Sequence, residues 1–218
     1  MSKPSIPSGK TWFDTHKVHF QHVPISADKG ISTDEFLDAA ESTTSLFEVL
    51  GSSIIFGRVK ADMITNITKV RERRRTSPAS SATLQSLCKT ELDFKSQFAT
   101  EGLLWLVRGL DFITQALTAE LTDNASVAPT EPKPKKELTE SWKTSYQTTL
   151  APFHNWLQRA LFNWAVKFAQ PRKDFYLKLA GPGTEPEAVR QALKTWILAL
   201  EQRVKILKAF VENKEARW

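Results

Sequence analysis

The chain has 218 residues and a net charge of +6, with 41% hydrophobic and 25% charged residues. This composition fits an ordinary globular domain, and no apolar run approaches the roughly 18 residues that a membrane-spanning helix needs. A single cysteine, Cys88, excludes an internal disulfide and fits a reducing compartment such as the cytoplasm. The positive charge is compatible with an anionic membrane surface or a nucleic acid and does not choose between them.

Residues 1–30 predict an irregular N-terminal arm, because prolines interrupt them and no helical or strand period appears. The arm contains three aromatic residues that we expect to anchor it: Trp12, Phe13 and Phe20. Residues 31–218 are expected to form a single domain. A histidine recurs at every third position from His16 to His22, but no cysteine or acidic ligand set accompanies it. We therefore expect no metal site in this arm.

Helical periodicity dominates the rest of the chain. The capping box Ser32–Glu35 begins a helix that runs to Gly51, and the box Thr184–Glu187 begins the last helix, which ends near Glu212. Between them, helices are predicted at 54–75, 84–92, 99–121, 141–150 and 152–170, and a short segment follows at 173–179. The helix at 99–121 is apolar nearly all round, which predicts a buried central element. Residues 122–137 contain three prolines and predict a polar, mobile loop within the domain.

The helix at 54–75 carries three polar side chains on one narrow stripe. At about 100° per residue, Asn66 lies about 40° from Asp62, and Lys69 lies about 20° away on the other side. An apolar arc borders the stripe and contains Phe56, Val59, Met63, Ile67 and Val70. A carboxylate, an amide and an ammonium beside an apolar surface suit a ligand with several hydroxyl groups and an apolar body. The three residues equally fit a solvated helix face on which they pair with one another.

The same helix ends in the basic run Arg71–Arg75. Cations are favoured at a helix C-terminus, and no aromatic residues or nucleic-acid motif accompany them. A solvated helix end is therefore expected, and no nucleic-acid partner.

Four motifs occur in a fixed order: KADMITNITK at 60–69, LLWLVRGLDF at 103–112, HNW at 154–156 and RKDFYLKL at 172–179. Together they resemble the glycolipid transfer protein superfamily, in particular its glycolipid-specific branch, over roughly residues 30–210. A fungal member is one reading of this resemblance. It implies an all-α fold of eight helices in two layers, enclosing a hydrophobic lipid tunnel.

The resemblance also implies roles for single residues. The expected headgroup site comprises Asp62, Asn66, Lys69, Trp105 and His154. In it Trp105 is a flat platform for the first sugar ring, and His154 bonds the ceramide amide. The expected lipid-chain tunnel is lined by Phe47, Phe56, Val59, Phe162 and Phe175, and Trp156 is expected to enter the membrane interface. A tyrosine that the family carries near its C-terminus has no match, and whether Trp218 replaces it stays open.

The residues alone leave plainer readings for this site. Without the motifs, Trp105 and His154 read as ordinary core residues. Arg108 either pairs with Asp62 and orients it, or bonds another buried acceptor. Phosphate recognition needs several cations around one pocket, and members of the sister branch that carries ceramide-1-phosphate replace the stacking tryptophan with a basic residue. Trp105 and Asn66 therefore favour a sugar headgroup.

The expected function is a carrier that binds one glycosphingolipid, of the glucosylceramide, galactosylceramide or lactosylceramide type, and moves it between membranes through the cytoplasm. A monomer that touches membrane surfaces transiently is expected. No catalytic set, metal cluster or phosphate loop is present in the sequence, so neither enzymatic activity nor a cofactor is expected. The alternatives are a ceramide-1-phosphate carrier of the same fold and a lipid sensor or adaptor that has lost transfer.

Overall fold

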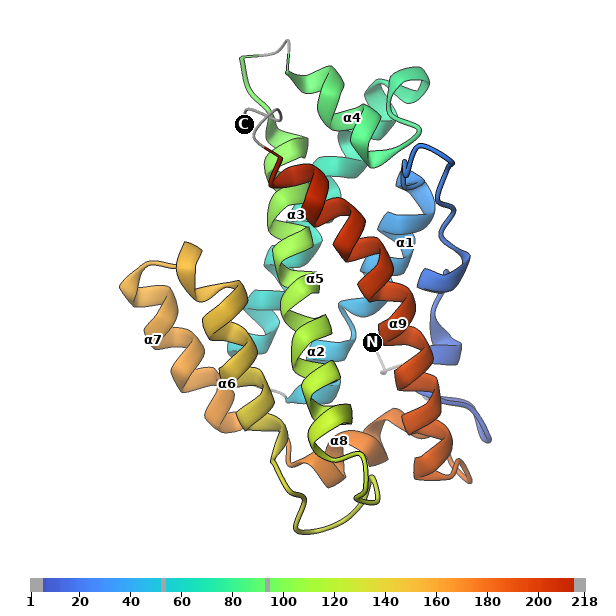
Figure 1. Ribbon diagram of the computed structural model, residues 1–218, viewed down its shortest axis with the longest axis vertical. Coiled ribbons are helices and arrows are strands. Elements are labelled where there is room, and N and C mark those ends of the chain that lie inside the picture. The colour runs from blue at the N-terminus through green and yellow to red at the C-terminus, as the bar shows by residue number, and fades with distance from the viewer. Residues whose placement is uncertain (1–5, 52–53, 93–94, 214–218) are drawn as a thin grey trace.

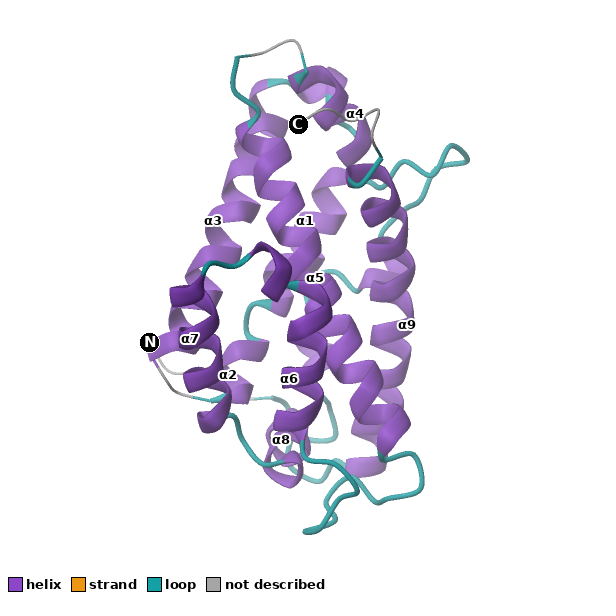
Figure 2. Ribbon diagram, turned by 60° about the vertical axis from the view of Figure 1, so that its left-hand side comes forward, coloured by secondary structure: helices purple, strands orange, loops and turns teal. Residues whose placement is uncertain are grey.

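The computed structural model describes residues 6–51, 54–92 and 95–213. Trp218, and with it the question of the C-terminal tyrosine, lies outside these ranges. The α-helices are α1 (Thr33–Thr43), α2 (Leu46–Leu50), α3 (Ile54–Thr76), α4 (Leu84–Glu91), α5 (Phe98–Asp123), α6 (Leu138–Thr149), α7 (Trp156–Ala165), α8 (Arg172–Leu179) and α9 (Pro186–Val211). Short 3-10 turns occur at Trp12–Thr15, Phe20–His22, Pro78–Ser80, Ala151–Phe153 and Val166–Phe168. Within these ranges the regular structure is all helical, as predicted (Figure 2).

The predicted helix at 33–50 is divided into α1 and α2. Two hydroxyl groups at the break donate to carbonyls three residues back, Thr44 Oγ1 to Glu41 O at 2.8 Å and Ser45 Oγ to Ser42 O at 2.9 Å. Such local bonds compete with the helical ladder, which ends α1 at Thr43. The hydroxyl of Ser45 also accepts the Trp12 indole N–H at 2.9 Å, so the break receives the N-terminal arm. With α1 and α2 taken as one unit, the described chain has the eight helices that were predicted.

The start of α7 differs from the prediction. Pro152 belongs to the 3-10 turn Ala151–Phe153, and α7 begins only at Trp156. Asn155 caps the helix, because its Oδ1 accepts the Gln158 N–H at 3.0 Å and Gln158 Oε1 accepts the Asn155 N–H at 2.9 Å. His154 therefore lies in an extended linker between the 3-10 turn and α7 and is not part of a helix.

The two predicted capping boxes have different outcomes. Helix α1 begins at Thr33 as predicted, although Ser32 Oγ donates to the Glu35 carboxylate and does not cap a backbone N–H. The second box is wrong, because the Thr184 hydroxyl donates instead to the carbonyl of Lys10 at 2.8 Å. The Thr184 hydroxyl therefore bonds the N-terminal arm and does not cap α9, which begins at Pro186.

The central position of α5 is confirmed: it contacts α3, α4, α6 and α9, with α6 on one side and α9 on the other (Figure 1). The inward face predicted for the last helix is also confirmed. Its buried residues include Val189, Leu193, Trp196, Ile197, Leu200, Val204 and Leu207. The three aromatic anchors of the arm are buried, and their rings surround Trp196 at centroid distances of 5.7 to 5.9 Å.

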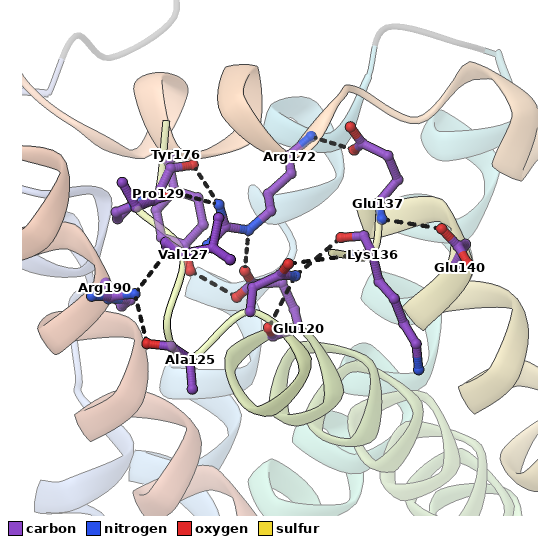
Figure 3. A network of polar contacts seen from close by, with 12 residues as sticks. Glu120, Ala125, Val127, Pro129, Lys136, Glu137, Glu140, Arg172, Tyr176 and Arg190 are labelled. Atoms are coloured by element: carbon purple, nitrogen blue, oxygen red, sulfur yellow. Dashed lines mark hydrogen bonds and ion pairs between the residues drawn. The ribbon is translucent and has the colours of Figure 1, made fainter. Parts of the chain in front are cut away.

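The loop before α6 is anchored by a buried polar network (Figure 3). Arg172 Nε donates to Glu120 Oε1 at 2.6 Å, and both side chains are fully buried. Tyr176 O–H donates to the other Glu120 oxygen at 2.7 Å, and Arg172 Nη1 donates to the carbonyls of Ala128 and Pro129. The loop expected to be mobile is thus held between α5 and α8.

The same network closes the base of a long excursion of the chain. The Arg172 N–H donates to Glu137 Oε2 at 3.0 Å, which joins the residue before α6 to the first residue of α8. The segment 138–171, which carries α6 and α7, therefore leaves and re-enters the core at one point. This segment forms one wall of the site described next.

Candidate functional site

A cavity of about 340 Å³ lies among α2, α3, α5, α6 and α7. Eight of the predicted headgroup and tunnel residues line it: Phe47, Phe56, Val59, Asp62, Asn66, Trp105, His154 and Phe162. The structure therefore brings most of the predicted site to one place. Its polar members belong to α3, to α5 and to the linker before α7.

The inner wall of the cavity is aromatic. Phe162 stacks on Tyr146 with ring centroids 3.6 Å apart and planes at 5°, and Phe112 lies 5.1 Å from Trp142. The sequence reading missed Phe112, Trp142 and Tyr146 as lining residues. The available signal was spacing, since Trp142 and Tyr146 are four residues apart on α6 and Phe112 lies two turns beyond Trp105 on α5.

Two polar side chains of α3 stand at the edge of this apolar volume. Asp62 is exposed, and it forms no ion pair with any described residue. Asn66 is only 6% exposed, and its side-chain amide has no hydrogen-bond partner among residues 6–51, 54–92 and 95–213. An amide without a protein partner at a cavity wall is a group that a polar ligand can bond.

Lys69 and Phe175 lie apart from this group. Lys69 is not part of the cavity wall, and its Nζ lies 3.4 Å from Glu101 on α5. Phe175 is fully buried beside Tyr176, at a centroid distance of 5.7 Å, and it too is absent from the wall. The helix α8 contacts α2 and α9, and this phenylalanine belongs to the buried hydrophobic core.

His154 joins the polar edge to the aromatic wall. Its ring is stacked obliquely on Trp105 at 6.0 Å and 29°, and its Nδ1 lies 2.9 Å from the Tyr146 hydroxyl. Burial lowers the pKa of His154, Asp62 partly opposes this by favouring the charged form, and Arg159 lowers it further. The imidazole is therefore neutral near pH 7, with one donor and one acceptor nitrogen.

In the described chain, Arg108 neither pairs with Asp62 nor donates to another buried acceptor, the two roles that the sequence suggested. Its guanidinium carbon lies 3.5 Å from the ring centre of Phe153 and 5.0 Å from that of Trp105. Stacking on these faces replaces a bond to Asp62, and no described residue accepts a hydrogen bond from it. Burial lowers the pKa of Arg108, and the charge of Glu212 partly restores it.

The outer side of α7 is apolar and open to solvent. Trp156 is 80% exposed. Other exposed apolar residues of α7 and of the 3-10 turns that flank it are Phe153, Leu157, Leu161, Trp164 and Phe168. None of the described helices is both long and apolar enough to cross a bilayer.

The glycolipid transfer protein family model matches residues 31–181. A glycolipid transfer protein of Aureobasidium melanogenum is 42% identical over 214 residues, which cover 98% of this chain and 99% of that relative. The chain belongs to the glycolipid transfer protein family. The resemblance in the four motifs is thereby confirmed.

Solved structures of this family confirm the fold. The crystal structure of HET-C2, a fungal glycolipid transfer protein, superposes with a TM-score of 0.84 at 43% identity and covers 95% of this chain and 100% of that one. A structure described as showing how FAPP2 selects simple glycosphingolipids with the same fold gives a TM-score of 0.81 at 27% identity, over 95% and 98% of the two chains. The predicted all-α, eight-helix, two-layer fold is therefore that of the glycolipid transfer proteins.

Proposed function

We propose that this chain binds one glycosphingolipid and carries it between membranes through the cytoplasm. The observation that carries the proposal is a single cavity with an aromatic, apolar interior and a polar edge made by Asp62, Asn66, Trp105 and His154. Such a cavity suits an amphiphile with a hydroxyl-rich head. The family, and the relatives named as glycolipid transfer proteins, support this assignment.

The polar edge fits a sugar. Asp62 accepts hydrogen bonds from hydroxyl groups, and Asn66 both donates and accepts. The indole face of Trp105 offers apolar area to the C–H face of a sugar ring. Lys69 adds a donor once a ligand competes with Glu101, whose ion pair with it is long and partly exposed.

The interior fits the ceramide. Neutral His154 can donate to the amide carbonyl at the junction of head and chains. The chains then lie against Phe47, Phe56, Val59 and Phe162, which line the wall. Moving an acyl chain through water costs about 0.8 kcal/mol per CH₂, and an enclosing cavity removes most of that cost. No covalent bond is made or broken in this process.

The charges around the cavity favour sugar over phosphate. A phosphate group needs several unpaired cations in one place. Here Lys69 is paired with Glu101, and Arg108 lies over two aromatic rings. Arg58 is the cationic residue of the described cavity lining.

The exposed face of α7 supports docking at a membrane surface. Trp156 presents most of its indole to solvent, and Arg159 and Lys167 are exposed nearby on the sequence. An amphipathic aromatic with basic neighbours suits a shallow, reversible contact with the interface. We assign Trp156 to that contact.

The experiment that tests the proposal is vesicle-to-vesicle transfer of labelled glucosylceramide beside ceramide-1-phosphate and phosphatidylcholine. We expect transfer of the glycolipid alone. Transfer of ceramide-1-phosphate would mean that the headgroup assignment is wrong. If none of the three moves, mass spectrometry of lipid that co-purifies with the native protein distinguishes a lipid sensor, which retains lipid, from an adaptor that binds none.

A further inference from the structure

Tyr146 is built into the cavity wall at the point where the head and chain regions meet. Its ring is 1% exposed and stacks face to face on Phe162 at 3.6 Å, while Phe112 meets its edge at 6.4 Å. These two contacts fix the ring on α6. The hydroxyl then lies 2.9 Å from Nδ1 of His154.

The proton positions of this pair follow from what each group can accept. Burial raises the pKa of Tyr146, so the hydroxyl keeps its proton, and the lowered pKa of His154 keeps the imidazole neutral. If Nδ1 carried the histidine proton, it would donate to the tyrosine oxygen, and the phenolic proton would need another acceptor. No described residue accepts a hydrogen bond from the Tyr146 hydroxyl other than His154. Donation from Tyr146 to Nδ1 satisfies the phenolic proton, which is buried, and leaves the Nε2–H of the half-buried His154 as the unpaired donor in the described chain.

We infer that Tyr146 is a positioning residue that fixes His154 as the Nε2–H tautomer, so that the histidine presents a donor, and not an acceptor, to the bound lipid. The inference rests on the proposed function and deepens it. The ligand group that faces His154 must then be an acceptor such as a carboxamide carbonyl. Phe162 links the tautomer of His154 to the site of the lipid chains, because the ring of Phe162 lines the cavity and also stacks on Tyr146.

The variant Tyr146→Phe keeps the stacked ring and removes only the hydroxyl. In the ligand-free wild type, ¹⁵N NMR of the His154 side chain should show a protonated Nε2 and an unprotonated Nδ1. In Tyr146→Phe we expect a mixture of both tautomers, since nothing else bonds Nδ1. Binding of galactosylceramide presented in phosphatidylcholine vesicles should weaken about three- to tenfold, the usual worth of one neutral hydrogen bond.

Tyr176→Phe is the matched control. It removes the hydrogen bond of the other tyrosine, to Glu120, and leaves the cavity wall intact. It should lower the melting temperature without changing the tautomer of His154 or the galactosylceramide affinity.

Three results would overturn the inference: a wild type protonated at Nδ1, an unchanged tautomer in Tyr146→Phe, or equal losses of affinity in both variants. The NMR measurement needs no lipid. A wild type that shows the Nε2–H tautomer but binds no galactosylceramide would therefore contradict the proposed function and leave the role of Tyr146 standing.

Discussion

Asp62 is a carboxylate at the polar edge of the cavity that the fold itself does not use, since it is exposed and forms no ion pair with a described residue. We expect Asp62→Val to lower glycolipid transfer by about 10- to 100-fold, because a hydrogen bond to a charged group is worth about 1.5–3 kcal/mol. Thermal unfolding should change little, as for most exposed substitutions. Vesicle transfer and a melting curve on the same preparation measure both effects.

Glu72→Gln is the control for this variant, because Glu72 lies on the same helix and, among the described residues, its carboxylate pairs only with the exposed Arg75. Its transfer activity should equal that of the wild type. Normal transfer by a folded Asp62→Val variant would remove Asp62 from the headgroup site.

His16 links the stability of the N-terminal arm to pH. It is 7% exposed, its ring centroid lies 4.1 Å from that of Trp12, and neither ring nitrogen has a hydrogen-bond partner in the described chain. Burial, with a smaller contribution from the charge of His19, lowers the pKa of His16 to about 4. The folded state therefore binds this proton less readily than the unfolded chain, whose histidines have a pKa near 6.5.

The sign of the effect follows from linkage. The stabilisation by neutral His16 is fully present above about pH 6.5 and is lost as the pH falls towards 4, roughly 3 kcal/mol in all. Urea unfolding between pH 7 and pH 4.5 should show this loss in the wild type and a shallower dependence in His16→Leu. The exposed His22 provides the control His22→Gln, which should follow the wild type. Identical pH dependence in His16→Leu and the wild type would contradict the prediction.

Sequence and structure agree on single residues where a local motif carries the information. Asp62 and Asn66 share a helix stripe, and Trp105 and His154 each lie in a motif, so all four could be placed at the site. The hydrogen bond between Tyr146 and His154 could not be predicted, because the linker after α6 sets it and no period along one helix encodes it. Phe175 shows the same limit, since aromatic type and motif did not say which way α8 would face.

Gly102 sets how closely α3 and α5 approach at the headgroup stripe. A Cβ at this position would lie 3.0 Å from the Asn66 carbonyl oxygen and 3.1 Å from Lys69 Cβ. Backbone cannot yield as a flexible side chain does, so Gly102→Ala should push the helices apart. We expect a loss of about 1–3 kcal/mol in the free energy of unfolding, as for other overpacked sites, together with weaker glycolipid transfer.

Gly109 offers the matched control on the same helix. It lines the cavity, and a Cβ there meets nothing within 4 Å. Gly109→Ala should stabilise the protein by up to about 1 kcal/mol through helix propensity. Denaturant unfolding of both variants tests the pair. A stabilised Gly102→Ala would mean that the two helices are not in tight contact at this point.

The buried ion pair of Arg172 and Glu120 secures the base of the segment 138–171 (Figure 3). Glu120→Gln leaves the Arg172 charge buried with only carbonyl partners, and removing one partner of such a pair costs about 3–5 kcal/mol. Glu72→Gln, at a fully exposed and solvent-screened pair, should cost much less. Chemical denaturation compares them, and equal losses in the two variants would contradict the role assigned to the network.

At the scale of elements, periodicity predicted where helices lie but not where side chains interrupt them. The apolar stripe continues through Thr44 and Ser45, whose hydroxyl bonds divide α1 from α2. The start of α7 was placed at Pro152, which is a favourable first residue of a helix, whereas the reciprocal cap of Asn155 and Gln158 decides it. Both differences depend on individual side-chain hydrogen bonds, which a helical period in the sequence does not encode.

At the scale of the whole molecule, α7 separates two apolar environments. Gln158, Leu161, Phe162 and Ala165 line the cavity, while Trp156 and Trp164 are exposed on the same helix. A helical period reports apolar residues without distinguishing those that face a core from those that face a membrane. Only the packing of α7 against α3 and, through Phe162, against Tyr146 of α6 reveals which face of α7 is exposed.

This arrangement predicts that docking and lipid recognition are separable. Trp156 is 80% exposed and does not line the cavity, so Trp156→Ala should weaken partitioning onto vesicles while leaving the preference for glycolipid over phosphatidylcholine intact. Burying one large apolar side chain is worth about 1.5–3 kcal/mol, which corresponds to a loss of about tenfold or more in the partition coefficient.

Leu198→Ala is the control, because Leu198 is 58% exposed on α9, outside the α7 face. Vesicle sedimentation measures partitioning for all three proteins. If Trp156→Ala partitions as the wild type does, or if Leu198→Ala loses as much, the α7 face is not the docking surface. If Trp156→Ala instead changes which lipid is carried, Trp156 contacts the lipid itself and the two roles are not separate.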